Sequence, residues 1–172
     1  MEINMTIKTG IIIVSDKGFR GDRVDQSGPA IRKVLEDGPY TVVGCQIVPD
    51  EKEAIQKAVL EFSEGLKCDL TLTSGGTGIS PRDVTPEATE AIIERHLPGF
   101  AEAMRMHSLT FTPHAMISRA VCGTYKETLI LNLPGSPKGA RECLEAVLPA
   151  IPHAIAKLKG DQSDCGGHHG LS

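Results

Sequence analysis

Apolar runs alternate with segments of helical periodicity in the first half of the chain, and this alternation most constrains the fold. The first run contains Ile11-Ile-Ile-Val14 without a polar interruption, which is typical of a strand in a sheet that is covered on both faces. Because amphipathic segments separate the runs, their order predicts right-handed parallel crossovers and a doubly wound sheet. Strands are expected over 7–15, 40–48 and 69–73, and helices over 27–37, capped by Ser27, and over 51–64.

The second half of the chain adds further helices and a pair of short strands. Leu97-Pro-Gly99 separates two helical segments, and Pro149 and Pro152 are expected to split or kink the last helix. Helices are expected over 86–96, over 100–109 and from Ser136-Pro137 onward, and strands over 118–123 and 128–133, joined by 124–127. The expected fold class is therefore α/β, with three layers, a doubly wound, mostly parallel sheet, helices on both faces and a small hairpin.

A glycine-rich run carries the strongest chemical signal, Thr73-Ser-Gly-Gly-Thr-Gly-Ile-Ser-Pro-Arg-Asp-Val-Thr-Pro-Glu-Ala-Thr89. Its glycines can adopt backbone angles that let consecutive N–H groups converge on an anion. Thr85-Pro86-Glu87 has the pattern of a helix start with Thr85 as the cap, and such an end carries partial positive charge. Gly-Gly-Thr-Gly alone would also fit a plain turn. The addition of Arg82, Asp83 and a capped helix favours a ligand site.

The whole run resembles that of the molybdopterin-binding family, most closely the molybdopterin adenylyltransferases and the G domain of gephyrin-like proteins. Further segments resemble loops of the family in the same order, namely 14–29, Val48-Pro-Asp-Glu51 and Asn132-Leu-Pro-Gly-Ser-Pro-Lys138. The uninterrupted stretch 81–89 resembles the adenylylating branch. The family domain is expected over 1–160, and the polar, glycine-rich stretch 161–172 is expected to be a disordered tail.

The resemblance implies transfer of AMP from ATP to the terminal phosphate of molybdopterin, with release of pyrophosphate. Ligands of an open parallel sheet bind beyond the carboxyl ends of its strands, where Asp50 and Asp83 are expected to lie. One carboxylate facing one phosphate charge at about 4 Å is unfavourable by roughly 4 kcal/mol at an effective dielectric near 20. An intervening Mg²⁺ is therefore expected, with Asp50 and Asp83 as the catalytic, metal-binding pair.

Substrate contacts are expected from the loops at the same edge of the sheet and from positions that match the family. The expected residues are Ser15, Asp16, Ser74, Gly75, Gly76, Thr77, Gly78, Arg82, Ser108, Asn132, Pro134, Gly135, Ser136 and Lys138. Several have structural alternatives: Asp50 as a helix cap, Asp83 as a turn-stabilising acid, Arg82 and Lys138 as surface charges, and Ser108 and Asn132 as capping or buried hydrogen-bonded residues.

Composition argues against several other classes. A net charge of −4, with four Phe, two Tyr and no Trp, disfavours a nucleic-acid surface. No apolar run of about 18 residues and no signal-peptide pattern is found, so a cytoplasmic protein without a membrane span is expected. The five cysteines are scattered and are expected to be reduced thiols, and neither the histidines nor Cys165-Gly-Gly-His-His169 is expected to form a functional metal site.

Two other functions compete with the adenylyltransferase interpretation. A non-catalytic molybdopterin-binding or scaffolding module is the main alternative, and the presence of both Asp50 and Asp83 favours the enzyme. A nicotinamide dehydrogenase is disfavoured because Gly-x-Gly-x-x-Gly does not follow the first strand. The resemblance also implies a homotrimer and a molybdate-insertion protein as partner, and it leaves open whether molybdenum or tungsten is used.

Overall fold

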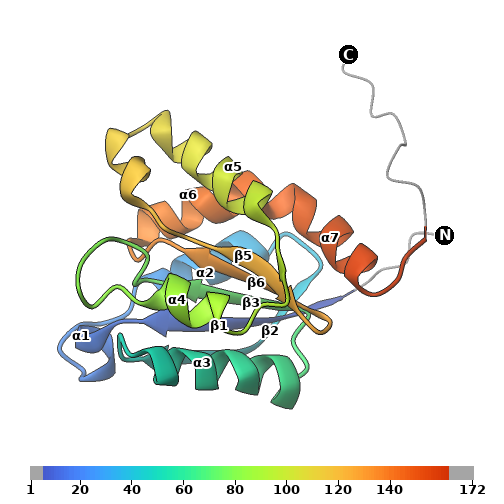
Figure 1. The fold of residues 1–172 in the computed structure, drawn as a ribbon, viewed down its shortest axis with the longest axis horizontal. Helices are drawn as coiled ribbons and strands as arrows, with labels where there is room; N and C mark the ends of the chain where they lie inside the picture. Colours follow the sequence, from blue (N-terminus) through green and yellow to red (C-terminus); the bar gives the residue numbers. More distant parts are fainter. Residues whose placement is uncertain (1–5, 163–172) are drawn as a thin grey trace.

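Six strands form one sheet in the order β2-β1-β3-β6-β5-β4 (Figure 1), in a computed structural model that describes residues 6–162. Four strands run parallel: β1 (Ile7–Val14), β2 (Tyr40–Val48), β3 (Leu70–Ser74) and β6 (Thr128–Leu133). β5 (Cys122–Tyr125) and β4 (Arg95–His96) extend the sheet in antiparallel register. The predicted doubly wound, mostly parallel sheet with a small hairpin is confirmed.

Helices cover both faces of this sheet (Figure 1). One face carries α2 (Ser27–Leu35), α5 (Pro98–Leu109), α6 (Pro137–Val147) and α7 (Ile151–Leu158). The other carries α3 (Lys52–Leu60), which continues into a π-helical turn (Glu61–Gly65), and α4 (Thr85–Glu90). Ile11 packs in the first core and Ile12 in the second, and both are fully buried. The unbroken apolar run of β1 therefore serves two cores.

The predicted helix over 86–96 is wrong in its second half. α4 ends at Glu90, and Arg95 and His96 form the edge strand β4 beside β5. The backbone N–H of Glu94 donates to the carbonyl of Thr124, and that of Leu97 to the carbonyl of Cys122, both at 2.8 Å. Pairing with β5 satisfies backbone groups that helical spacing along the chain does not reveal.

The strand predicted over 118–123 is displaced to Cys122–Tyr125. Side chains take several hydrogen bonds of the preceding segment: Arg105 donates to the carbonyls of Ser118 and Ala120, and the Asn132 side-chain oxygen Oδ1 accepts from the N–H of Val121 at 3.1 Å. The predicted hairpin is present, and its turn places Lys126 at a φ of 51°.

Two predicted helix caps are wrong, and one is confirmed. Both Ser27 and Thr85 lie inside their helices, where the Ser27 hydroxyl donates to the carbonyl of Gly135 and the Thr85 hydroxyl to that of Gly75. The carboxylate of Asp25 accepts from the first N–H groups of α2 instead. Ser136 does cap its helix by accepting from the N–H of Gly139, and a 3₁₀ turn (Leu148–Ala150) splits the last helix as predicted.

Other expectations from composition concern the cysteines, the membrane and the tail. Cys68, Cys122 and Cys143 are buried free thiols and Cys45 is an exposed one, as expected for reduced cysteines, whereas Cys165 lies outside the described residues. Within residues 6–162, no helix has the length and apolar character needed to cross a bilayer. Most of the predicted tail, residues 163–172, also lies outside the described part of the chain.

The strand order brings the carboxyl ends of β1 and β3 together, and this is the point at which the winding of the sheet reverses. There the backbone of Gly75 passes against β1. A Cβ on Gly75 would lie 2.2 Å from the carbonyl oxygen of Val14, and the φ of Gly75 is +111°. The N–H of Gly75 donates to Leu133 at 3.1 Å, so β6 fixes this backbone from the other side. Only glycine fits here.

We expect Gly75→Ala to destabilise the fold more than Gly21→Ala. Gly21 has a similarly unfavourable φ of +81° but open space around the added Cβ, so its substitution should cost about 1–2 kcal/mol from backbone conformation alone. The collision with Val14 should add about 1–3 kcal/mol for Gly75→Ala. Urea denaturation of the two variants measures the difference, and equal costs would contradict the close approach.

Candidate active site

Two pockets meet at the carboxyl edge of the sheet, where the glycine loop 75–78 and the loop 134–136 contribute to both. The β1 pocket, of about 700 Å³, is lined in part by Ser15, Asp50, Ser74, Gly75, Gly76 and Gly135. The α5 pocket, of about 370 Å³, is lined in part by Thr77, Gly78, Ser108, Pro134, Lys138 and Cys143. Ser136 lines both pockets, so they adjoin. Most of the predicted substrate-binding residues therefore lie on two joined pockets.

Backbone N–H groups of the glycine loop are available for a ligand. The carbonyls of Gly75, Gly76 and Thr77 are all occupied: they accept from the Thr85 hydroxyl, the Thr85 N–H and the Arg119 N–H, at 2.8, 3.1 and 2.8 Å. Within the described part of the chain, the N–H groups of Gly76, Thr77 and Gly78 donate to no protein acceptor. Consecutive unpaired N–H groups in such a loop form an anion-binding concavity.

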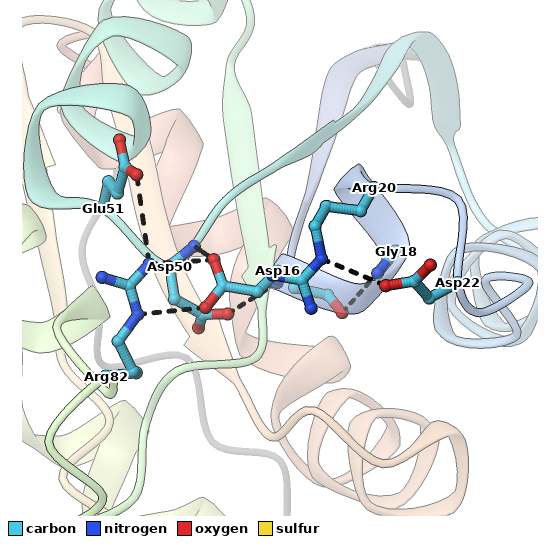
Figure 2. Close-up of polar contacts among 8 residues, drawn as sticks. Asp16, Gly18, Arg20, Asp22, Asp50, Glu51 and Arg82 are labelled. Carbon is cyan, nitrogen blue, oxygen red and sulfur yellow. Dashed lines mark hydrogen bonds and ion pairs between the residues drawn. The ribbon is translucent and has the colours of Figure 1, made fainter.

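Asp16 and Asp50 are locked together across the ends of β1 and β2 (Figure 2). The N–H of Asp16 donates to the Asp50 carboxylate at 2.8 Å, and the N–H of Asp50 donates to the Asp16 carboxylate at 3.0 Å. The helix-cap alternative for Asp50 is not what is observed, because α3 begins after Glu51 without a side-chain cap. The exchange instead joins two loops and presents the Asp50 carboxylate to the β1 pocket.

Arg82 contacts a carboxylate in this structure. Its guanidinium donates to both carboxylate oxygens of Asp16, through Nε at 3.0 Å and Nη2 at 2.9 Å, and it lies 4.0 Å from the Glu51 carboxylate (Figure 2). Its side chain is 56% exposed, so part of the guanidinium faces solvent. Neither Arg82 nor Asp16 lines the two pockets. Arg82 therefore acts here on the charge of the aspartate pair.

The two linked aspartates have opposite pKa shifts. Burial raises the pKa of Asp50, and the negative charges of Asp16 and Asp83 add to the rise, against the hydrogen bond from Asp16. The hydrogen bond from Arg82 lowers the pKa of Asp16. The Asp50 carboxylate is thus surrounded by excess negative charge, which favours binding of a cation.

Asp83 supports the turn in which it lies. Its carboxylate accepts from the N–H of Ser80 at 2.8 Å, and its own N–H donates to the carbonyl of Ser80 at 2.9 Å. A Cβ on Gly78 would lie 2.8 Å from the same carboxylate, which places Asp83 against the glycine loop. The turn-stabilising alternative is therefore observed, and it is compatible with a second role because the charge of Asp83 reaches Asp50.

The hydroxyl groups at this edge have partners within the protein. Ser74 donates to the carbonyl of Pro134 at 2.7 Å, and Ser15 accepts from the N–H of Gly18 at the start of the short helix α1 (Asp16–Phe19). Ser108 shares a hydrogen bond of 3.3 Å with Cys143 in the α5 pocket. These bonds hold the pocket walls together and leave the unpaired N–H groups as the principal donors.

Of two further predicted contact residues, one lies away from the pockets and the other on a pocket rim. Asn132 is fully buried: its amide nitrogen donates to Thr73 and Thr89 at 2.9 Å, and it lines neither pocket. Its buried, hydrogen-bonded alternative is the one observed. Lys138 lies on the rim of the α5 pocket with a 74% exposed side chain, 3.9 Å from Glu142. Its ammonium is accessible to an anion.

A magnesium ion fits this donor set only together with a phosphorylated ligand. Among the described residues, no group of three or more His, Cys, Asp or Glu side chains is placed to hold a metal. Asp50 lines the β1 pocket, and Asp83, which lines neither pocket, places its carboxylate against Gly78 of the glycine loop. Mg²⁺ commonly uses one or two carboxylates plus substrate phosphates and water, so this pair suits it.

Sequence reasoning missed Arg119, which contacts the glycine loop from the segment before β5. It donates to the carbonyls of Gly78 and Asp83, both at 2.7 Å, and pairs with Glu87. No sequence pattern identifies Arg119, because it lies 41 positions from Gly78 along the chain. Sequence reasoning also missed Asp25, although an acid two residues before a helix start is a recognisable capping signal.

Comparison with known proteins agrees with this fold and site. The profile of a family described as "Probable molybdopterin binding domain" matches residues 10–153. The molybdopterin adenylyltransferase of Helicobacter pylori (strain ATCC 700392 / 26695) is 44% identical over 158 residues, which cover 91% of this chain and 90% of that protein. Gephyrin of Dictyostelium discoideum is 46% identical over 159 residues, which cover 87% of this chain and 22% of gephyrin.

Solved structures give the same result. The molybdopterin biosynthesis enzyme MoaB of Thermus thermophilus has a TM-score of 0.86 and 53% identity, covering 90% of this chain and 98% of that one. The tungsten cofactor synthesizing protein MoaB of Pyrococcus furiosus has a TM-score of 0.80 and 33% identity, with the same coverage. The chain belongs to the molybdopterin-binding domain family.

We expect Asp50 to bind a proton at higher pH than Asp16 during acidification. The pKa of Asp50 is raised in the folded protein. Its ionisation therefore lowers the free energy of unfolding as pH rises through that folded-state pKa. The lowered pKa of Asp16 has the opposite sign: its stabilisation is full above the ordinary value of 3.8 and is lost as pH falls through the folded value. Carboxyl ¹³C NMR, assigned with Asp16→Asn and Asp50→Asn, measures both. Titration of Asp50 below Asp16 would contradict this order.

Proposed function

We propose that this chain is a molybdopterin adenylyltransferase that transfers AMP from ATP to the terminal phosphate of molybdopterin and releases pyrophosphate. The observation that carries the proposal is the row of unpaired N–H groups at Gly76, Thr77 and Gly78 beside Asp50 and Asp83. Phosphate oxygens match these donors, and relatives that span about nine-tenths of the chain are molybdopterin adenylyltransferases.

The two joined pockets suit two phosphorylated substrates. ATP is assigned to the β1 pocket, where Asp50 lies, and the pterin to the α5 pocket, which contains Ser108 and Lys138. The glycine loop and Ser136 border both pockets, so they would hold the phosphates that react. An oxygen of the molybdopterin phosphate attacks the α-phosphorus of ATP as the bond to the pyrophosphate oxygen breaks. This nucleophile is already ionised near neutral pH, so positioning and charge neutralisation carry the reaction.

Asp50 and Asp83 are proposed to hold Mg²⁺ against the ATP phosphates. The ion would supply charge neutralisation between the carboxylates and the polyphosphate. Asp16, bonded to both Asp50 and Arg82, keeps the Asp50 carboxylate turned toward the pocket. The unpaired N–H groups would stabilise negative charge on the transferred phosphoryl group. We further propose a cytoplasmic location and delivery of the product to a molybdate-insertion protein.

We expect Asp50→Asn and Asp83→Asn each to lower adenylyl transfer about a hundredfold or more, since each removes one preorganised charge. Molybdopterin binding should survive, because the proposed pterin pocket is lined by neither residue. The melting temperature should also stay nearly unchanged, since Asn keeps an oxygen acceptor for the N–H groups of Asp16 and Ser80.

The assay incubates the purified chain with molybdopterin, ATP and Mg²⁺ and measures pyrophosphate and adenylylated pterin. Asp22→Asn is the matched control, because the Asp22 side chain is exposed, pairs with Arg20 and lines neither pocket. Full activity of both site variants at saturating ATP and Mg²⁺ would reject the assigned roles. Pterin binding without any turnover by the unmodified chain would return the scaffolding module to first place.

We also propose that the chain is a homotrimer. Exposed apolar side chains gather at the end of α5 and in the segment after it: Met106, Leu109, Phe111, Met116 and Ile117 are 42–72% exposed. Such a group favours burial against another subunit. Light scattering should return three times the chain mass of 18.4 kDa at micromolar concentration. A stable monomer under these conditions would reject the proposal.

A further inference from the structure

Arg119 reaches the glycine loop at several points from a different part of the chain. Its Nε donates to the carbonyl of Gly78 and one terminal nitrogen to that of Asp83, both at 2.7 Å. The other terminal nitrogen pairs with the carboxylate of Glu87 in α4, and the backbone N–H donates to Thr77 at 2.8 Å. One residue therefore spans the loop from Thr77 to the first turn of α4.

These bonds set the direction of the peptide groups that would meet substrate. In a trans peptide, the C=O and the following N–H point in opposite directions. The bond from the Arg119 N–H to the Thr77 carbonyl therefore turns the N–H of Gly78 away from Arg119. In the same way, the bonds of Thr85 to the carbonyls of Gly75 and Gly76 turn away the N–H groups of Gly76 and Thr77. All three unpaired N–H groups face away from the bonds that hold the loop.

We propose that Arg119 is a positioning residue for adenylyl transfer, which keeps the glycine loop in its phosphate-binding form and holds Asp83 beside Asp50. This inference rests on the proposed function. Arg119 acts through the loop backbone, and it lines neither pocket. Its own position is secured by Arg105 of α5, which donates to the carbonyls of Ser118 and Ala120 on either side of it.

The geometry requires an arginine. Its planar fork serves three acceptors in different directions, whereas a lysine ammonium is a point charge on a flexible stem and cannot bridge the same set. The two carbonyl bonds are the important ones, because the ion pair with Glu87 joins side chains that are 37% and 46% exposed. Exposed ion pairs contribute little to stability. Removing Glu87 alone should therefore leave the loop in place.

The test compares Arg119→Lys and Arg119→Ala with the matched control Glu87→Gln. We expect both Arg119 variants to lose at least about tenfold in turnover number, while Glu87→Gln stays within about twofold. Hydrogen exchange should accelerate in the peptide covering 76–85 in both Arg119 variants and remain unchanged in the sheet. Calorimetric titration with Mg²⁺ and pyrophosphate should show at least about tenfold weaker binding in both.

Several results would overturn the proposal. One is that Arg119→Lys keeps the turnover number and the hydrogen-exchange rates of the unmodified chain, since a lysine would then suffice to hold the loop. Another is a loss of activity that parallels faster exchange throughout the sheet, which is the pattern of a residue needed only for folding. If Arg119→Ala does not fold, the turnover and hydrogen exchange of Arg119→Lys test the proposal. If the unmodified chain shows no adenylyl transfer, the proposed function fails, while exchange and pyrophosphate binding still test Arg119.

Discussion

The orientation of the glycine-loop peptides is the constraint on which the rest of the site depends. The carbonyls from Gly75 to Gly78 accept bonds from Thr85 and Arg119, while the N–H groups of Gly76, Thr77 and Gly78 find no acceptor among residues 6–162. A loop whose backbone N–H groups lack protein partners must be held in place by other bonds. The bonds of α4 and Arg119 meet this need.

A second constraint is the accumulation of negative charge beside that loop. The backbone N–H of each of Asp16 and Asp50 donates to the carboxylate of the other, and Asp83 adds charge from the neighbouring turn. The hydrogen bond from Arg82 lowers the pKa of Asp16, whereas burial keeps the pKa of Asp50 raised. Ionised Asp50 is thus destabilising in the free protein. A bound cation would remove this cost, so the arrangement favours ligand binding over stability of the empty fold.

The central elements and much of the pocket could be predicted from the sequence. β2 and β6 have the predicted bounds, and Ser136 caps its helix, because these depend on local apolar patterning and on neighbouring residues. The predictions that are wrong depend on distant partners. Arg95 and His96 become a strand because β5 is beside them, and the Ser27 hydroxyl leaves its helix end because Gly135, 108 positions away, offers a carbonyl. Helical periodicity carries no information about either contact.

By itself the sequence determined the layered α/β architecture, the family and the loops that gather at one edge. The period of apolar residues, the placement of glycines and the alternation of strands with helices can all be read along the chain. Only the tertiary structure decided what each polar group does. It placed Asn132 in the core, paired Arg82 with Asp16 and brought Arg119 to the glycine loop. A hydrogen bond needs its donor and acceptor about 2.7–3.2 Å apart. Where the two groups are distant in the chain, only the packed fold sets that distance.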